Sequence, residues 1–155
     1  MGDRPAKTLY YKRCRFVTQL PTDCLYSPDH FWLRQDPQGK WRVGLTKFAT
    51  RLLGEMVEHG FSVELNDPVT AGQIIGWVEG FKAISDLLCV AAGKFAGSNP
   101  ALKEDITLLN RDPFGAGWVY SVEGKPGAQC LPVQAYVAIL DQTIDRLRKA
   151  QDSRR

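Results

Sequence analysis

The alternation of apolar and polar positions along the chain predicts many short strands. Short apolar runs recur and are separated by Gly, Pro, Asn and Asp residues, which favour turns. Strands are expected at residues 13–17, 30–33, 41–45, 61–65, 73–79, 84–90, 94–96 and 117–122. Short strands with closely spaced turns are typical of a barrel or a sandwich.

Three segments carry helical patterns instead. Thr46 is a good N-cap for a short helix that Gly54 ends. A small helix is expected to start at residues 99–101, with Leu102, Ile106 and Leu109 on one side. The clearest helix begins at Pro132 and has an apolar stripe formed by Val133, Tyr136, Val137, Leu140, Ile144 and Leu147. We therefore expect a mainly β fold with peripheral helices, on which the last helix packs.

Charge and composition narrow the classes of function. The 155-residue chain has a net charge of +3, yet residues 1–20 and residues 146–155 each sum to +4, so the body between them is acidic. Basic ends of this kind are typical of solvated termini, although an end could also dock a charged partner. No apolar run is long enough to span a membrane, and none follows the first charged residues as in a secretory signal. We expect a cytoplasmic protein that binds neither nucleic acid nor membrane.

The cysteine and histidine spacing argues against a metal site. There is no C-x-x-C motif, and neither His30 nor His59 lies near a cysteine in the sequence. In a reducing compartment, we expect free thiols at Cys14, Cys24, Cys89 and Cys130.

Lys82 lies at the tip of a predicted hairpin between residues 73–79 and 84–90. A tight hairpin presents its tip residue on a rigid base, which a group-carrying arm needs. The lysine amine can form an amide with a carboxylic-acid cofactor such as lipoate or biotin, and Gly80 lets the chain turn. Biotin is disfavoured because Phe81 and Ala83, rather than methionines, flank the lysine. The alternative is an ordinary solvated lysine.

Residues 79–87, Glu-Gly-Phe-Lys-Ala-Ile-Ser-Asp-Leu, resemble the lipoylation segment of the glycine cleavage system H protein. Other motifs of that family follow in order between residues 25 and 122: Tyr26, Asp29-His30, Trp32, residues 43–49, 53–55 and 63–65, Gly93, and residues 99–102 and 110–118. The resemblance implies a barrel-sandwich hybrid of the lipoyl/biotinyl-carrier type, with lipoyl on Lys82. It also implies a substrate carrier that is not an enzyme.

The resemblance divides the chain into three parts. These are a basic N-terminal extension at residues 1–25, a lipoyl-carrier domain at residues 26–122, and a linker with the C-terminal amphipathic helix at residues 123–155.

Some positions depart from the H-protein pattern. Phe31 stands where the family has a Glu that helps to hold the aminomethyl cargo in a cleft, whereas Asp86, the other acid of that cleft, is present. Gly80 replaces the usual Ser. In these respects the chain resembles the lipoate-binding proteins of the heterodisulfide-reductase-like sulfur-oxidation system. An apolar cleft near Phe31 would suit a neutral or soft sulfur adduct better than a cation.

The candidate cofactor site consists of one attachment lysine and its surroundings. Its residues are Lys82, Glu79, Gly80, Asp86, Phe31 and His30. Cys89 is a candidate redox thiol that could exchange with the disulfide of the arm, and the alternative is that it is a buried structural residue. His30 has the alternative of a structural hydrogen bond. If position 31 borders an open cleft, Phe31→Glu is expected to leave folding nearly unchanged.

Three hypotheses follow for the function. The first is a lipoyl carrier of a sulfur species, served by heterodisulfide-reductase-like sulfur-oxidising enzymes and by lipoate-attaching enzymes. The second is the aminomethyl carrier of glycine cleavage, with glycine decarboxylase, aminomethyltransferase and dihydrolipoyl dehydrogenase as partners. The third is an adaptor that keeps the fold without lipoyl.

Overall fold

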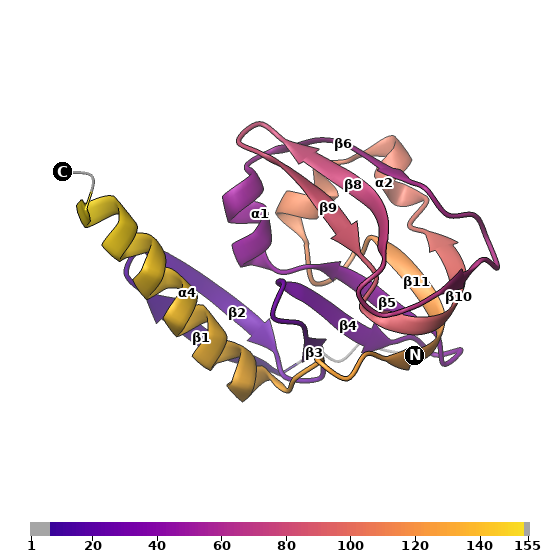
Figure 1. The fold of residues 1–155 in the computed structure, drawn as a ribbon, viewed down its shortest axis with the longest axis horizontal. Coiled ribbons are helices and arrows are strands. Elements are labelled where there is room, and N and C mark those ends of the chain that lie inside the picture. The colour runs from indigo at the N-terminus through magenta and orange to yellow at the C-terminus, as the bar shows by residue number, and fades with distance from the viewer. Residues whose placement is uncertain (1–6, 154–155) are drawn as a thin grey trace.

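The computed structural model describes residues 7–153 and is built mainly from antiparallel strands (Figure 1). The first six residues of the predicted basic extension, and the two C-terminal arginines, lie outside the described residues. The larger sheet has the order β3-β4-β5-β11-β10-β7. Its strands are β3 (Leu25–Tyr26), β4 (Phe31–Gln35), β5 (Trp41–Leu45), β7 (Pro68–Val69), β10 (Ala91–Ser98) and β11 (Tyr120–Pro126).

A smaller sheet, β6-β8-β9, faces the larger one. It consists of β6 (Met56–Phe61), β8 (Ile74–Gly80) and β9 (Ile84–Leu88). One apolar core is shared by both sheets and includes Leu33, Val43, Ile75, Val78, Leu87 and Val122. The predicted mainly β fold is confirmed.

The helix with the predicted N-cap is α1 (Lys47–Leu53). The Thr46 hydroxyl accepts a hydrogen bond from the Ala49 N–H, and the chain leaves the helix at Gly54 with a φ of 82°. Both ends of α1 therefore follow from local sequence.

A helix starts at Ala101 as predicted, but its continuation as one helix through Ile106 and Leu109 is wrong. The chain forms α2 (Ala101–Glu104) and α3 (Leu108–Arg111), with an extended residue, Asp105, between them. The Asp105 carboxylate accepts hydrogen bonds from the Thr107 backbone N–H and hydroxyl. A short polar side chain that bonds to the backbone in this way competes with helix continuation.

The strand predicted at residues 13–17 is also wrong, because those residues span the turn of a hairpin. Strands β1 (Thr8–Arg13) and β2 (Phe16–Pro21) pair with each other, and Cys14 in the turn has a φ of 56°. This hairpin packs on the long C-terminal helix α4 (Val133–Ser153). We call β1, β2 and α4 the hairpin–helix module.

The module has its own apolar core and continues onto the body. Tyr11, Phe16 and Leu20 of the hairpin pack with Tyr136, Leu140 and Ile144 of α4, and the same cluster includes Tyr26, Trp32 and Phe48. Arg13 bridges to Asp145 at 2.8 Å and to Asp141 at 3.3 Å. The predicted packing of the last helix on the body is confirmed, although the hairpin covers much of its length.

Other strands begin or end a few residues away from their predicted boundaries. The strand predicted at residues 61–65 is wrong, since pairing with β8 involves Met56–Phe61 and the chain then turns at Asn66, whose φ is 72°. The last strand starts at Tyr120 rather than at residue 117 and continues to Pro126. The three-part division of the chain stays a prediction.

Within residues 7–153, no helix is long and apolar enough to cross a membrane. In the same range, no group of three His, Cys, Asp or Glu side chains is arranged to hold a metal ion.

Candidate functional site

Lys82 lies at the exposed tip of the β8–β9 hairpin. The register pairs Glu79 with Ile84, and the Gly80 N–H donates to the Ala83 carbonyl at 2.9 Å. Phe81, Lys82 and Ala83 therefore form the tip, and all three are exposed. The predicted position of Lys82 on a tight hairpin agrees with the structure.

The hairpin tip is held by the C-terminal end of α1. The Lys82 N–H donates to the Leu53 carbonyl at 2.9 Å, and the Phe81 N–H donates to the Glu55 carbonyl at 3.0 Å. The last carbonyls of a helix lack partners within the helix, so the tip satisfies one of them. The backbone of Lys82 is thereby fixed while its side chain projects outward.

Two glycines permit this close approach. A Cβ on Gly54 would lie 2.9 Å from the Lys82 Cγ, so the lysine stem passes directly over that glycine. A Cβ on Gly80 would lie 2.2 Å from the Leu53 carbonyl oxygen. Asn110 supports the same segment by donating to the Gly54 carbonyl and by accepting from the Met56 N–H. Asn110 was not predicted as a site residue, although it lies in one of the family motifs.

Gly80→Ser is expected to destabilise the fold by about 1–3 kcal/mol, because the new Cβ would collide with backbone. Thermal unfolding measures this loss, and faster amide exchange at Lys82 would show that its bond to Leu53 has opened. Ala83→Ser is the matched control, since it adds only a hydroxyl at an exposed position of the same hairpin. Equal stability of the two variants would contradict the close packing at Gly80.

A cleft of about 370 Å³ opens beside the hairpin. It lies between β9, α1 and the turn that precedes β4, and its lining residues are Asp29, His30, Phe31, Leu45, Ala49, Leu52, Leu53, Ser85, Asp86 and Leu88. The structure thus brings together three predicted site residues, His30, Phe31 and Asp86. Glu79 and Gly80 do not line the cleft.

The cleft has apolar walls and two exposed carboxylates, Asp29 and Asp86. Such a surface accommodates an aliphatic chain and offers hydrogen-bond acceptors to a polar end group. Asp29 was not predicted as a site residue, although it immediately precedes His30 in the recognised motif.

Phe31 is a buried core residue rather than one that projects into an open cleft. Its side chain is only 3 % exposed and belongs to the main core, opposite Leu45 on β5. It contributes to the wall of the cleft, but most of its surface packs inside the protein. The expectation that Phe31→Glu would leave folding nearly unchanged is therefore wrong for a side chain buried in this way.

His30 connects the cleft to α4. Its Nδ1 lies 2.8 Å from the Tyr136 hydroxyl, which lies 2.9 Å from the Thr46 hydroxyl at the start of α1. Burial lowers the pKa of His30, so the neutral imidazole is favoured. The Tyr136 hydroxyl thus connects the turn before β4 with the start of α1, which are two walls of the cleft. His30 therefore makes a structural hydrogen bond, which was the alternative to a role in the site.

Tyr136→Phe is expected to lower the free energy of unfolding by about 1–3 kcal/mol, because buried polar partners lose their hydrogen bonds. The ring still stacks on Tyr26, so only the hydroxyl contribution changes. Thermal denaturation checks this, with Tyr10→Phe as the control because Tyr10 is exposed. If both variants unfold at the wild-type temperature, the hydroxyl does not brace the cleft.

Cys89 is fully buried, and its thiol donates to the Ala91 carbonyl at 3.0 Å. Burial raises its pKa, which suppresses the reactive thiolate. These observations favour the structural alternative over a redox role.

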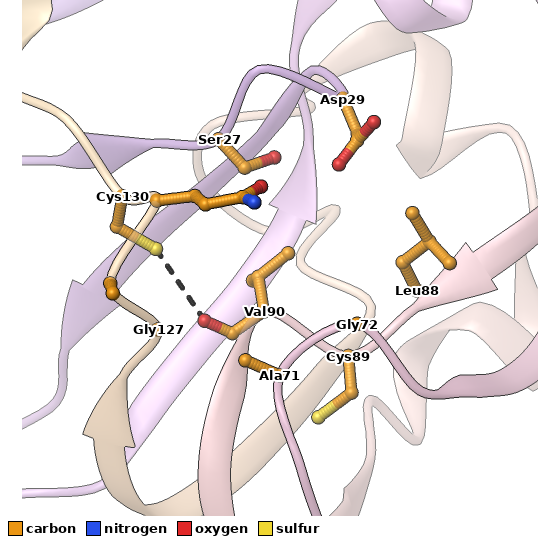
Figure 2. Close-up of a pocket in the computed structure, with 11 residues that line it drawn as sticks. Ser27, Asp29, Ala71, Gly72, Leu88, Cys89, Val90, Gly127 and Cys130 are labelled. Atoms are coloured by element: carbon orange, nitrogen blue, oxygen red, sulfur yellow. Dashed lines mark hydrogen bonds between the residues drawn. The ribbon is translucent and has the colours of Figure 1, made fainter.

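A second pocket of about 240 Å³ adjoins the cleft and shares Asp29 and Leu88 with it. Figure 2 shows Cys130 facing Val90 in this pocket, with the Cys89 thiol directed away from Cys130. The Cys130 thiol donates to the Val90 carbonyl at 3.4 Å, and burial raises its pKa as well. Neither thiol is activated for exchange.

Comparisons with known proteins agree on one family. The model of the glycine cleavage H-protein family matches residues 24–135. The glycine cleavage system H protein of Corynebacterium jeikeium is 36% identical over 125 residues, which are 79% of this chain and 98% of the relative. That of Cronobacter sakazakii is 34% identical over 131 residues, with coverage of 81% and 98%.

A solved structure shows the same fold. The crystal structure of the glycine cleavage system H protein from Mycobacterium marinum superposes with a TM-score of 0.70 at 35% identity, and covers 77% of this chain and 97% of that one. The predicted barrel-sandwich hybrid is supported by this match. Strands β1 and β2, and most of α4, lie outside the residues that the family model matches.

Proposed function

Because this chain belongs to the glycine cleavage H-protein family, we propose that it carries a lipoyl group in amide linkage on Lys82. It is a carrier protein and not an enzyme. The observation that supports the site is the placement of Lys82: its backbone is held by Leu53 and its side chain is exposed. Lys82 does not line the cleft itself, but Ser85 and Asp86 of the same hairpin do. We propose that it works in the cytoplasm.

The residues around Lys82 fit the proposed group. Within the described part of the chain, the Lys82 Nζ has only a long contact of 3.5 Å with the Arg51 carbonyl, which leaves the amine accessible for acylation. The apolar walls formed by α1, Leu45 and Leu88 can cover an aliphatic chain and exclude water from it. When attached, the group supplies a disulfide that can be reduced to a dithiol and can carry a cargo.

The cargo that the comparisons support is the aminomethyl group of glycine. The curated relatives described above are all glycine cleavage system H proteins. Asp29 and Asp86 offer carboxylate oxygens at the cleft, and a cationic amine is held well by such acceptors. The proposed partners are then glycine decarboxylase, aminomethyltransferase and dihydrolipoyl dehydrogenase.

A sulfur species is the second candidate cargo, supported by Phe31 in the cleft wall. An aromatic side chain at that position gives no hydrogen bond to a cation, whereas it tolerates a neutral or soft sulfur group. The partners would then be heterodisulfide-reductase-like enzymes. In either case a lipoate-attaching enzyme must act first.

Reconstitution separates the two cargoes. The lipoylated protein is mixed with glycine decarboxylase, aminomethyltransferase and dihydrolipoyl dehydrogenase, and glycine-dependent CO2 release is measured, with the unlipoylated chain as control. Efficient turnover that requires lipoyl would support the aminomethyl cargo and exclude the sulfur cargo as the main one. Absence of turnover by a fully lipoylated protein would contradict the glycine cleavage function. Absence of lipoyl mass on any lysine would favour the adaptor hypothesis.

A further inference from the structure

We propose that one end of the hairpin–helix module is a docking site for a protein with an acidic surface. This end is formed by the β1–β2 turn and the last turns of α4, and we call it the basic end. Its side chains are Lys12, Arg15, Arg146, Leu147, Arg148 and Lys149. All of them lie outside residues 24–135, which match the family model, and the proposal does not depend on lipoylation of Lys82.

Two segments from opposite ends of the chain form the basic end. The β1–β2 turn contains Arg15, and the Arg148 guanidinium of α4 donates to the Cys14 thiol in that turn at 3.4 Å. One helical turn earlier, the Asp145 carboxylate accepts two hydrogen bonds from Arg13. The hairpin turn and the last turns of α4 are therefore held side by side.

The basic end carries positive charge that the described structure does not neutralise. None of its five cationic side chains takes part in an ion pair found among residues 7–153, and all five are exposed. Asp141 and Asp145 on the same helix both pair with Arg13, which leaves Asp152 as the only other acid among residues 146–153. Charge concentrated in this way attracts an anionic partner, whereas it repels a second basic end. A symmetric dimer through this surface is therefore disfavoured.

Leu147 gives the basic end an apolar centre. It continues the stripe of Leu140 and Ile144 along α4, yet it is 45 % exposed while the other two are buried. It is the only large apolar side chain that is exposed among the described residues of α4. Protein interfaces commonly have an apolar centre with a polar rim, which is the arrangement of Leu147 and the surrounding cations.

This combination favours a protein over other anionic partners. A nucleic acid is held mainly through its phosphates, which offer no apolar contact for Leu147. A helix that binds an anionic membrane presents a broad apolar face, whereas α4 buries most of its apolar stripe against the hairpin and the body. The partner is therefore expected to present carboxylates around an apolar side chain.

Helix α1 connects the basic end to the Lys82 hairpin. Phe16, which follows Arg15, packs edge-on against Phe48 of α1, with 5.3 Å between the ring centroids. Leu53 of the same helix accepts the hydrogen bond from the Lys82 N–H, and it lies about 7.5 Å from Phe48 along the helix axis. In Figure 1 the C-terminal end of α4 and the β8–β9 hairpin extend toward the same side, with α1 between them. A partner docked on the basic end would thus keep any group on Lys82 at a high effective concentration.

Binding of a defined acidic peptide tests this proposal. The probe is a fluorescein-labelled peptide of glutamates and aspartates with one central phenylalanine, and fluorescence anisotropy measures its Kd for the unlipoylated chain. The double variant Arg15→Glu, Arg148→Glu is expected to weaken binding about tenfold or more, because attraction becomes repulsion. Leu147→Ser is expected to weaken it about fivefold, and to abolish the preference over a peptide with a central serine.

A matched control separates the basic end from net charge. The double variant Lys103→Glu, Lys125→Glu changes the net charge equally at exposed positions of α2 and β11. It should bind the peptide with nearly the wild-type affinity, and melting temperatures show that each variant is folded. Added salt should weaken binding by the wild type much more than binding by the Arg15→Glu, Arg148→Glu variant.

Cys14 reports where the peptide binds. It is exposed, whereas Cys24 and Cys89 are buried and Cys130 is only partly exposed, so a maleimide modifies it first. Saturating peptide is expected to slow the modification of Cys14 in the wild type, and to leave its rate unchanged in the charge-reversed variant. Peptide binding that leaves Cys14 equally reactive in the wild type would place the peptide elsewhere and would contradict the proposal.

Four further outcomes would overturn the proposal. The first two are no measurable binding of the peptide, and equal affinity of the wild type and the charge-reversed variant. The third is tighter binding of a DNA duplex or of phosphatidylglycerol vesicles through Arg15 and Arg148, because the partner would then not be a protein. The fourth is salt-sensitive self-association that charge reversal abolishes, which would assign the surface to a second copy of this chain. All are measured without lipoyl, so they are independent of the outcome for Lys82.

Discussion

Lys82→Arg is expected to abolish the added lipoyl mass completely and to leave thermal unfolding unchanged. A guanidinium stays protonated at physiological pH and offers no amine nucleophile for acylation. The side chain at this position is exposed, and among residues 7–153 its only polar contact, with the Arg51 carbonyl, is long. Intact-mass measurement of protein from cells supplied with lipoate gives the result directly.

Lys47→Arg is the matched control for this experiment. Lys47 lies in the same depression and is also exposed, yet it is on α1 rather than on the hairpin. This variant should carry the full lipoyl mass. Lipoyl on Lys82→Arg, or its loss from Lys47→Arg, would contradict the assignment of Lys82 as the attachment site.

Phe31→Glu is expected to lower the free energy of unfolding by about 3–5 kcal/mol, which is typical for loss of a buried aromatic side chain. The ring is 3 % exposed and packs in the main core, so the new carboxylate would replace apolar contacts with an unpaired charge. Asp29 and Asp86 share the cleft and would repel it. Calorimetry should show a fall in melting temperature on the order of 10 °C.

Phe31→Leu is the control, with an expected loss below about 1.5 kcal/mol because the position stays apolar and similar in volume. A large loss of stability in Phe31→Glu but not in Phe31→Leu would show that the main role of Phe31 is packing in the core. It would thereby weaken the argument from position 31 for a sulfur cargo. A Phe31→Glu protein as stable as the wild type would show instead that the position tolerates an acid facing the cleft, as first expected.

The parts of the site that were predictable depend on contacts close in sequence. The hairpin at Lys82 follows from two apolar strands joined by a short turn that begins at Gly80. The limits of α1 follow from a capping hydroxyl at Thr46 and a glycine at position 54. In each case the interacting groups lie within a few residues, so local patterns are sufficient to locate them.

Contacts between distant segments decided what local patterns could not show. Whether Phe31 faces a cleft or the core depends on how β4 packs beneath the other sheet, because a strand residue can face either environment with the same local pattern. The role of His30 depends on Tyr136, which is 106 residues away. The hairpin of β1 and β2 was predicted as one short strand, since its pairing is stabilised by α4 at the other end of the chain.

The sequence by itself therefore determined the family, the mainly β fold and the position of Lys82 at the tip of a hairpin, because these depend on motif order and on local alternation and turn signals. Only the tertiary structure decided which side chains surround that lysine, how α1 holds the hairpin, and which candidate residues are buried. The physical reason is that burial and hydrogen bonding between distant segments are properties of the packed chain. No short stretch of sequence contains both partners.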